Sequence, residues 1–304
     1  MSLNLPCINT AADYERIFES GVWRQVAAVI CARHRISYIS LRRSPHGENI
    51  IFYVDKAFVV KIFAPFRDNY LRERSALEFA HGKLSIRTPE VLHTGEIETW
   101  SYLVMTQLAG HASREVWASI GRRDRLDIVS RLGAAMSELH AHHAPLSQPA
   151  LDRDWQTFIE RQASESVERQ RACGANPEWL VRLPAYIAER MELLPTNQPP
   201  VFLHGDIHAG NVLFVEEGGR WRVAGLIDFG DSMCGLREYE FVAPGVLMVQ
   251  GDGELQRTLL LAYGYKESEL DATLRARLML LTVLYECSDL RKYALRLAPD
   301  ADVE

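Results

Sequence analysis

The chain has 304 residues, of which 47% are hydrophobic and 24% charged, so it is large enough to fold into two lobes with separate hydrophobic cores. A formal net charge of −6 and an isoelectric point near 6.0 argue against a nucleic-acid-binding protein, which would need a strongly basic face. The five cysteines are scattered and no apolar stretch is long enough to cross a bilayer, so we expect reduced thiols, no membrane partner and a cytoplasmic location.

The N-terminal part of the sequence predicts helix followed by antiparallel sheet. Apolar residues recur at helical spacing over residues 10–34, with a break near Ser20 and Gly21. Alternating apolar residues then predict three strands over residues 37–41, 49–54 and 57–63, separated by short turns. Lys61 interrupts the third strand, and a buried lysine is costly unless a carboxylate meets it. The alternative is a lysine on an edge strand that reaches solvent.

The next segment, residues 69–84, predicts a helix that carries a partner for Lys61. Glu73 falls on the apolar face of this helix, whereas Glu78 has Arg74 and Ser75 as helical neighbours and is expected to point to water. In kinases, a helix glutamate paired with a strand lysine fixes that lysine on the nucleotide phosphates. The simpler alternative is that both glutamates are solvated on the helix surface.

A change of pattern near Gly110 divides the chain into two lobes. Strands expected over residues 91–97 and 101–108 complete a five-stranded antiparallel sheet, so we assign residues 1–108 to an N-terminal nucleotide-binding lobe. Residues 109–304 form a larger, mainly helical lobe with the catalytic loop and the acceptor site, giving an α+β class with two lobes. Helices are expected there over residues 122–143, 155–172, 177–194 and, from about 252, to 297, with a hairpin of strands over residues 212–215 and 221–229.

Two short motifs in the second lobe carry the chemistry. Residues 204–211 read HGDIHAGN, and residues 227–231 read IDFGD after a predicted strand. We expect Asp206 to orient an acceptor hydroxyl and accept its proton, and Asn211 and Asp228 to supply oxygen ligands to Mg²⁺. The alternative is that an Asp-His-Asn set of this kind forms a structural polar network.

The turn between the first two strands is the candidate phosphate loop. We expect backbone amides of this turn, at Ser44, His46 and Gly47, to cap the nucleotide phosphates that Lys61 and Glu73 hold. The turn departs from the protein kinase pattern because it has one glycine where that pattern has three.

The two motifs together resemble those of the aminoglycoside phosphotransferase and choline kinase-like family, which shares its bilobal fold with protein kinases. The segment from Asp231 to Glu240 is similar in pattern to the hygromycin B kinases. The resemblance implies an ATP- and Mg²⁺-dependent kinase that phosphorylates an alcohol group. It also implies that the adenine stacks below Met105 and hydrogen-bonds to main-chain atoms of Thr106 and Leu108.

The acceptor is the part of the reaction that the motifs leave open. The family resemblance and the acidic balance favour a small cationic molecule, such as an aminoglycoside or another polyhydroxylated amine, and an antibiotic acceptor would make the chain a resistance enzyme. A protein serine/threonine kinase, a choline, homoserine or sugar kinase and a non-catalytic nucleotide-binding module are the alternatives. We expect a monomer, because the helices show no long heptad seam. Acidic candidates for an amine-binding wall, placed by analogy, are Asp154, Glu160, Asp231, Glu238, Glu286 and Asp289.

Overall fold

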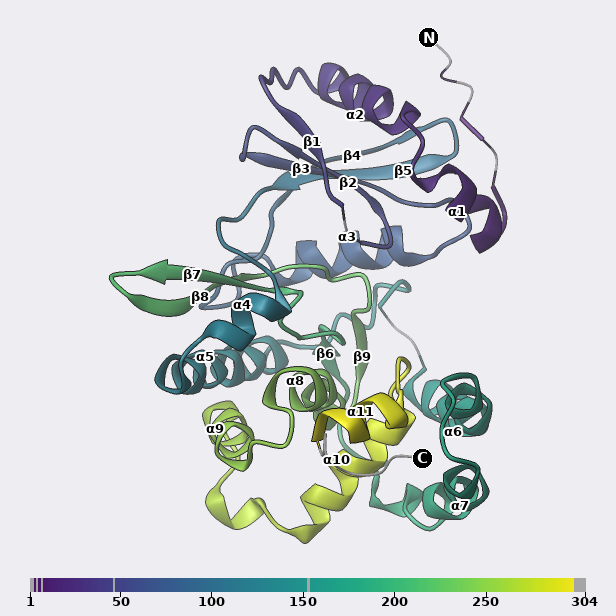
Figure 1. Cartoon of the computed structure of the whole chain (residues 1–304), viewed down its shortest axis with the longest axis vertical. Coiled ribbons are helices and arrows are strands. Elements are labelled where there is room, and N and C mark those ends of the chain that lie inside the picture. The colour runs from purple at the N-terminus through teal and green to yellow at the C-terminus, as the bar shows by residue number, and fades with distance from the viewer. Residues whose placement is uncertain (1–2, 4, 7, 46, 152–153, 298–304) are drawn as a thin grey trace.

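A computed structural model of the chain describes residues 3, 5–6, 8–45, 47–151 and 154–297 and shows two lobes, one above the other (Figure 1). The upper lobe contains a five-stranded antiparallel sheet with strand order β1-β2-β3-β5-β4. Figure 1 places α2 above this sheet and α3 between the sheet and the lower lobe. The bounds in this lobe are α1 (Ala11–Phe18), α2 (Val22–Arg33), β1 (Leu41–Arg43), β2 (Ile50–Val54), β3 (Phe58–Ile62), α3 (Asn69–Ala80), β4 (Val91–Ile97) and β5 (Trp100–Thr106).

The alternation of β3 explains how a lysine is accommodated in an apolar strand. Val60 and Ile62 point to one face of the sheet, where they join a core with Trp23 of α2 and Trp100 of β5. Lys61 lies on the opposite face, because successive side chains of a strand alternate. This second face is covered by α3, so the two-residue period places Lys61 toward the interior between the lobes.

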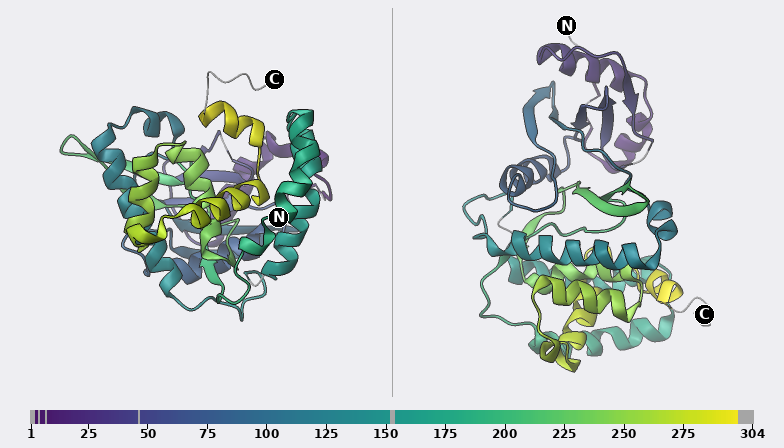
Figure 2. Two further views of the ribbon diagram at one scale, coloured as in Figure 1. Left: turned by 90° about the horizontal axis from the view of Figure 1, so that it is seen from below. Right: turned by 90° about the vertical axis from the view of Figure 1, so that its left-hand side faces the viewer.

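The lower lobe is mainly helical (Figure 2). Its long helix α5 packs along α9, and the two share one apolar core with residues of the upper lobe's α3. Two antiparallel strand pairs, β6 with β9 and β7 with β8, also contribute side chains to this core. Its elements are α4 (Arg114–Ser119), α5 (Arg122–Ala141), α6 (Trp155–Ala172), α7 (Pro177–Ala188), β6 (Val201–Leu203), β7 (Val212–Glu217), β8 (Arg220–Leu226), β9 (Met233–Gly235), α8 (Val242–Pro244), α9 (Gly253–Tyr263), α10 (Ala272–Leu284) and α11 (Leu290–Leu297), with short turns η1 (Met191–Leu193), η2 (Arg237–Phe241), η3 (Gly245–Val249) and η4 (Glu267–Glu269).

The predicted fold class and the five-stranded sheet are confirmed, but several boundaries differ. The first strand begins at Leu41, because the Asp55 carboxylate binds the backbone N–H groups of Ile39 and Ser40 and removes them from strand pairing. The helix predicted to residue 84 ends at Ala80, just before Gly82 with a φ of 72°. The helix predicted to residue 194 ends at Ala188, and the 252–297 region contains three helices.

The sequence prediction also missed two features of the lower lobe. The residue 237–249 segment is a run of short helical turns, and β9 pairs with β6 beneath the catalytic loop. None of the helices in the described part of the chain is long and apolar enough to cross a membrane.

Candidate active site

The catalytic loop, residues 204–211, joins β6 to β7 and holds Asp206 through both carboxylate oxygens. Asn211 Nδ2 donates to Asp206 Oδ2 over 2.9 Å, and His208 Nε2 lies 3.2 Å from the same oxygen. The phenol of Tyr285 donates to Asp206 Oδ1 over 3.1 Å. Burial raises the pKa of Asp206, but the contacts with His208 and Tyr285 lower it by more, so its pKa lies below the ordinary value. Asp206 is therefore an ionised and firmly oriented carboxylate at neutral pH.

A buried glutamate, Glu240, accepts hydrogen bonds from the backbone of the catalytic loop. Glu240 is 1% exposed and accepts the backbone N–H groups of His204 over 2.7 Å and Gly205 over 2.9 Å. His140 Nε2, from α5, lies 3.4 Å from the same carboxylate. Gly205 has a φ of 86°, and a Cβ there would lie 2.6 Å from the carbonyl oxygen of Asp231. The residue before Asp206 must therefore be glycine, with its amide anchored by Glu240.

Lys61 stands between two carboxylates at the junction of the lobes. Its Nζ lies 2.6 Å from Glu73 and 2.8 Å from Asp228. Burial lowers the pKa of Lys61, but Asp228 and Glu73 raise it by more, so the lysine stays charged. Glu78 instead pairs with Arg74 over 2.9 Å on the exposed face of α3, as its helical neighbours predicted. The structure thus brings the strand lysine, the helix glutamate and the metal-motif aspartate together.

A cavity of about 490 Å³ lies beside Lys61, next to residues predicted to contact the nucleotide. Met105, Thr106 and Leu108 all line it. The Thr106 N–H already donates to the Glu90 carbonyl over 3.0 Å, so a main-chain donor to adenine would have to be the N–H of Leu108. The other lining residues include the apolar side chains of Ile51, Val59, Val116, Leu213 and Ile227.

The phosphate turn is only partly as predicted. Gly47 has a φ of 117°, but it is not among the residues that line this cavity; it lines a second cavity that also contains Lys61. The backbone N–H of Ser44 donates to the carbonyl of Ile51 over 2.8 Å, so the prediction that this amide caps a phosphate is wrong: the β1–β2 hairpin uses it. His46 lies outside the described residues.

A second cavity, of about 450 Å³, opens on the other side of Lys61 and Asp228, and we call it the acceptor cavity. Asp206, Asp231 and Glu286 are among its lining residues. Burial, followed by the charges of Asp206 and Asp228, raises the pKa of Asp231 to about 6. Two of the predicted acidic candidates, Asp231 and Glu286, therefore face the same space as Asp206.

The prediction of Glu238 as an acceptor-binding residue is wrong. Its side chain is 0% exposed and lies 2.8 Å from Arg277 Nη1 of α10. A carboxylate enclosed in this way cannot reach a ligand, and it neutralises a partly buried arginine instead.

Three further acidic candidates are also away from the acceptor cavity. Asp154 accepts the backbone N–H of Thr157 over 2.6 Å and caps α6, and Asp289 accepts that of Lys292 over 2.9 Å at the start of α11. Glu160 accepts a bond from the neighbouring α6 side chain Gln156 on the exposed surface. Asp154 and Asp289 are therefore helix caps, and Glu160 is a surface side chain.

The oxygen donors of the site suit magnesium shared with phosphates. The Nδ2 of Asn211 is committed to Asp206, which leaves Oδ1 as the atom of this side chain that can face a cation. The Asp228 side chain is 48% exposed and lines the cavity with Asn211. Among the described residues there is no cluster of three His, Cys, Asp or Glu suited to a metal ion. Two protein oxygens with room for phosphates and water fit Mg²⁺, which seldom occupies an all-protein cage.

Comparison with family models adds an independent observation. Residues 44–279 match the model described as the phosphotransferase enzyme family, APH. The chain belongs to this family. The matched span contains Lys61, Glu73, Asp206, Asn211 and Asp228, whereas Tyr285 and Glu286 lie just beyond it.

Solved structures of the family share this fold. The GDP complex of wild-type aminoglycoside 2'-phosphotransferase-IIIa aligns with a TM-score of 0.69 at 20% identity, covering 91% of this chain and 93% of that one. The streptomycin-ATP-APH(2")-IIa ternary complex gives 0.61 at 17% identity, covering 90% and 95%. A thermostable mutant of APH(4)-Ia with AMP-PNP and hygromycin B gives 0.60 at 19% identity, covering 90% and 95%. The predicted family and kinase-like fold are confirmed.

One relative found by sequence is named for an acceptor other than an aminoglycoside. A probable ketoamine kinase of Enterococcus faecium is 26% identical over 164 residues, which cover 48% of this chain and 53% of that protein. The chain thus spans about half the length of this curated relative.

Two residues of the site escaped the sequence prediction. Glu240 was detectable, because it is a charged residue within the apolar run Tyr239 to Val242, the same signal that identified Lys61. Tyr285 gave no such signal, since a tyrosine at the end of a helix is ordinary and its contact with Asp206 joins residues 79 positions apart.

Proposed function

We propose that this chain is a kinase that transfers the γ-phosphoryl group of ATP to a hydroxyl of a small, polyhydroxylated amine such as an aminoglycoside. The observation that carries the proposal is the meeting of the two cavities: Lys61 and Asp228 line both, and Asp206 lines the acceptor cavity. A γ-phosphoryl group at this junction would face a hydroxyl held by Asp206. Such positioning, with charge neutralisation, is most of what phosphoryl transfer requires.

In the proposed reaction, Asp206 accepts a hydrogen bond from the acceptor hydroxyl and takes its proton. The new phosphorus–oxygen bond forms as the bond to the departing ADP breaks. A low pKa suits Asp206 because, in a loose transition state, the carboxylate is needed first to orient the hydroxyl. Lys61 would bind the phosphates, with its position fixed by Glu73. Asn211 and Asp228 would hold Mg²⁺, which supplies further neutralisation of phosphate charge.

The cationic character of the acceptor is inferred from the cavity wall. Five carboxylates and two cationic side chains line the acceptor cavity: Glu48, Asp206, Asp228, Asp231 and Glu286 against Lys61 and Arg72. An ammonium group of the acceptor would reduce the repulsion among these carboxylates. The solved relatives named for aminoglycosides and the curated relative named for ketoamines both suggest amines that carry several hydroxyls.

The direct test is transfer of radiolabelled phosphate from ATP to a panel of aminoglycosides, ketoamines, choline, homoserine, neutral sugars and casein. Wild type is compared with Asp206→Ala and with Asp206→Asn, which keeps the side-chain shape. We expect magnesium-dependent labelling of one amine class and almost none with either variant. Labelling of casein alone would identify a protein kinase, and no labelling above the Asp206→Ala control would defeat the proposal.

A test in cells separates antibiotics from metabolites. Susceptible bacteria expressing wild type or Asp206→Ala are grown on hygromycin B and on kanamycin. A higher tolerated concentration with wild type alone identifies an antibiotic acceptor. Equal tolerance, together with in vitro labelling of a ketoamine or choline, identifies a metabolite kinase.

A further inference from the structure

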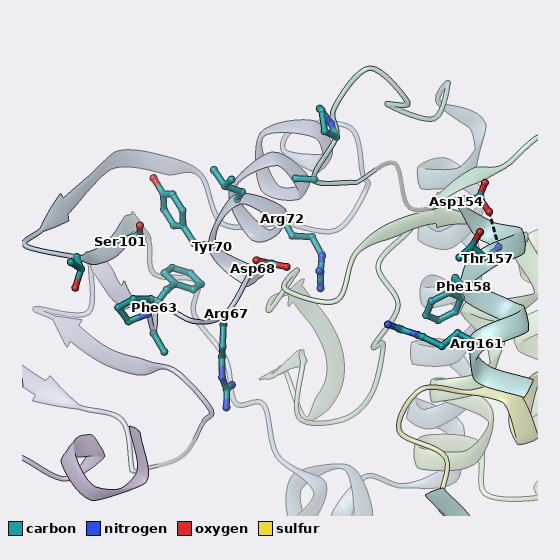
Figure 3. A pocket seen from close by; sticks show the side chains of 16 residues that line it. Phe63, Arg67, Asp68, Tyr70, Arg72, Ser101, Asp154, Thr157, Phe158 and Arg161 are labelled. Carbon is teal, nitrogen blue, oxygen red and sulfur yellow. Dashed lines mark hydrogen bonds between the residues drawn. The ribbon is translucent and has the colours of Figure 1, made fainter. Parts of the chain in front are cut away.

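A third cavity of the described structure adjoins the acceptor cavity. It has a volume of about 770 Å³ and lies between α3 and its preceding loop in the upper lobe and the first two turns of α6 in the lower lobe (Figure 3). Its wall also includes Thr99 and Ser101 at the β4–β5 turn and Pro149 and Ala150 before α6. We call it the outer cavity. None of the functions assigned so far uses it.

The charged groups of the outer cavity are mainly arginines. Three arginines and two aspartates line it, in contrast to the acidic acceptor cavity: Arg67, Arg72, Arg161, Asp68 and Asp154. The Asp154 carboxylate is engaged in capping α6, so its charge is partly offset by the N–H groups of that helix. The outer cavity is therefore the more cationic of the two.

Two of the arginines point into the space between the lobes. Figure 3 shows Arg72 extending from α3 and Arg161 extending from α6 into the space between the two helices, with Arg67 farther from α6. Arg67 is paired with Glu48 over 2.6 Å. The Arg161 guanidinium lies 5.9 Å from the centre of the Phe158 ring, one α6 turn earlier, which helps to orient it. Guanidinium groups are the usual protein partners of planar, oxygen-bearing anions, which they bind through two parallel hydrogen bonds.

The outer cavity is connected to the acceptor cavity by the same two arginines. Arg72 lines both cavities. Arg161 Nη2 lies 3.5 Å from Glu286 Oε1, and Glu286 lines the acceptor cavity beside Asp206. A ligand that extends from Asp206 past Glu286 would therefore come close to Arg161.

We infer that the outer cavity is a subsite for an anionic oxygen group, a carboxylate or a phosphate, on the same acceptor whose hydroxyl Asp206 orients. This inference rests on the proposed function and narrows its substrate class to a zwitterionic, polyhydroxylated amine. The anion would contact Arg72, whose Nη1 also donates to the Gly230 carbonyl over 3.2 Å, and Arg161, which would exchange Glu286 for the anion. Glu286 would then be available to the ammonium group, so the arginine–glutamate pair of the ligand-free protein is replaced by two pairs with the ligand.

The test measures binding of matched compounds by titration calorimetry, with Mg²⁺ and a non-hydrolysable ATP analogue present. The first pair is N-(1-deoxyfructosyl)glycine and its glycinamide counterpart, which keeps the amine but lacks the carboxylate, and the second is glucosamine 6-phosphate and glucosamine. Wild type, Arg161→Gln and Arg161→Lys are compared with Arg171→Gln, an exposed arginine on the same helix that is paired with Glu168. A charge-assisted hydrogen bond lost from Arg161 should weaken binding of an anionic compound by about tenfold or more.

In at least one pair, we expect the compound that carries the carboxylate or phosphate to bind more tightly than its partner without that group. We expect Arg161→Gln to remove that preference. Arg161→Lys should retain part of it, and Arg171→Gln should retain all of it. The pair that shows the preference identifies carboxylate or phosphate as the group recognised. The inference is overturned if neither pair shows a preference, which includes the case in which no compound binds. It is also overturned if a preference is found and Arg161→Gln leaves it unchanged. If the enzyme phosphorylates an amine that lacks a carboxylate or phosphate and shows no such preference, the anion subsite is disproved and the proposed kinase activity stands.

Discussion

The phenolic oxygen of Tyr285 lies 3.1 Å from Asp206 Oδ1 and 3.2 Å from the carbonyl oxygen of Gly205, so one side chain at the end of α10 contacts both the candidate catalytic carboxylate and the residue before it. One phenolic proton serves two acceptors, and the ring is 4% exposed. The proximity of Asp206 and the burial of the ring raise the pKa of Tyr285 well above its ordinary value, so the phenol remains a donor throughout the working pH range.

Replacing Tyr285 with phenylalanine should move the acidic limb of the pH–rate profile to higher pH. The phenol stabilises ionised Asp206, so its loss raises the pKa of that carboxylate and activity falls at a higher pH than in wild type. We expect kcat to fall about tenfold, the cost of one hydrogen bond to a charged group. Steady-state rates from pH 4 to 9 with ATP and the best acceptor provide the measurement. Tyr293→Phe, whose hydroxyl bonds to the carbonyl of Cys287, is the control. If the acidic limb does not shift, Tyr285 contributes packing but does not stabilise the ionised carboxylate of Asp206.

Two glutamates of α3 provide a matched pair for the nucleotide site. Glu73→Gln should lower kcat/KM for ATP by about 10- to 100-fold, because Lys61 would lose a partner that fixes it toward the phosphates. Glu78→Gln should change this parameter less than twofold, because its pair with Arg74 is exposed. Initial rates at varied ATP and saturating acceptor distinguish the two. Equal effects of both substitutions would contradict the assigned role of Glu73.

The sequence predicts the fold best where a short-range pattern determines the structure. The two-residue period around Lys61 and the helical period around Glu73 are local, and each places its side chain on the correct face of its element. The same is true of the fold class, since strands followed by long helices indicate an α+β protein. The strand expected over residues 37–41 was wrong because Asp55, from the far side of a hairpin, binds that backbone instead.

The acceptor side could not be predicted in the same way. Glu238 and Glu240 are two residues apart in the turn η2, yet one pairs with Arg277 of α10 and the other anchors the catalytic loop. Tyr285 and Glu286 come from the end of α10, and Arg72 from α3. Their convergence depends on how two lobes pack, which has no local period in the sequence. The Lys61–Glu73 pair of the nucleotide side, in contrast, comes from one strand and one helix, and each of these elements has a local period in the sequence.

Substitution of the loop anchor Glu240 should reduce both stability and turnover, whereas substitution of its neighbour Glu238 should reduce stability alone. Both carboxylates are buried, so Glu240→Gln and Glu238→Gln should each lower the free energy of unfolding by about 2–3 kcal/mol. Only Glu240 accepts the amides beside Asp206, so kcat should fall several-fold in Glu240→Gln and stay near wild type in Glu238→Gln. Urea denaturation and initial rates at 25 °C measure the two quantities. A normal kcat for folded Glu240→Gln would show that the loop holds its shape without this anchor.

Binding of an amine acceptor should strengthen as the pH rises through about 6, the pKa to which burial and the neighbouring carboxylates Asp206 and Asp228 raise Asp231. Below that pH Asp231 is neutral in the free enzyme and contributes no attraction to an ammonium group, and above it the carboxylate is charged. The KM for the amine should therefore fall between pH 5 and pH 7, as measured with ATP saturating at each pH. Asp231→Asn should flatten this dependence and raise the KM at pH 7 by about tenfold. Glu160→Gln, on the exposed surface of α6, should retain the wild-type profile. If the pH profile of Asp231→Asn keeps the wild-type slope, another carboxylate of the cavity is responsible for the pH dependence. Glu286 would then be the next residue to substitute.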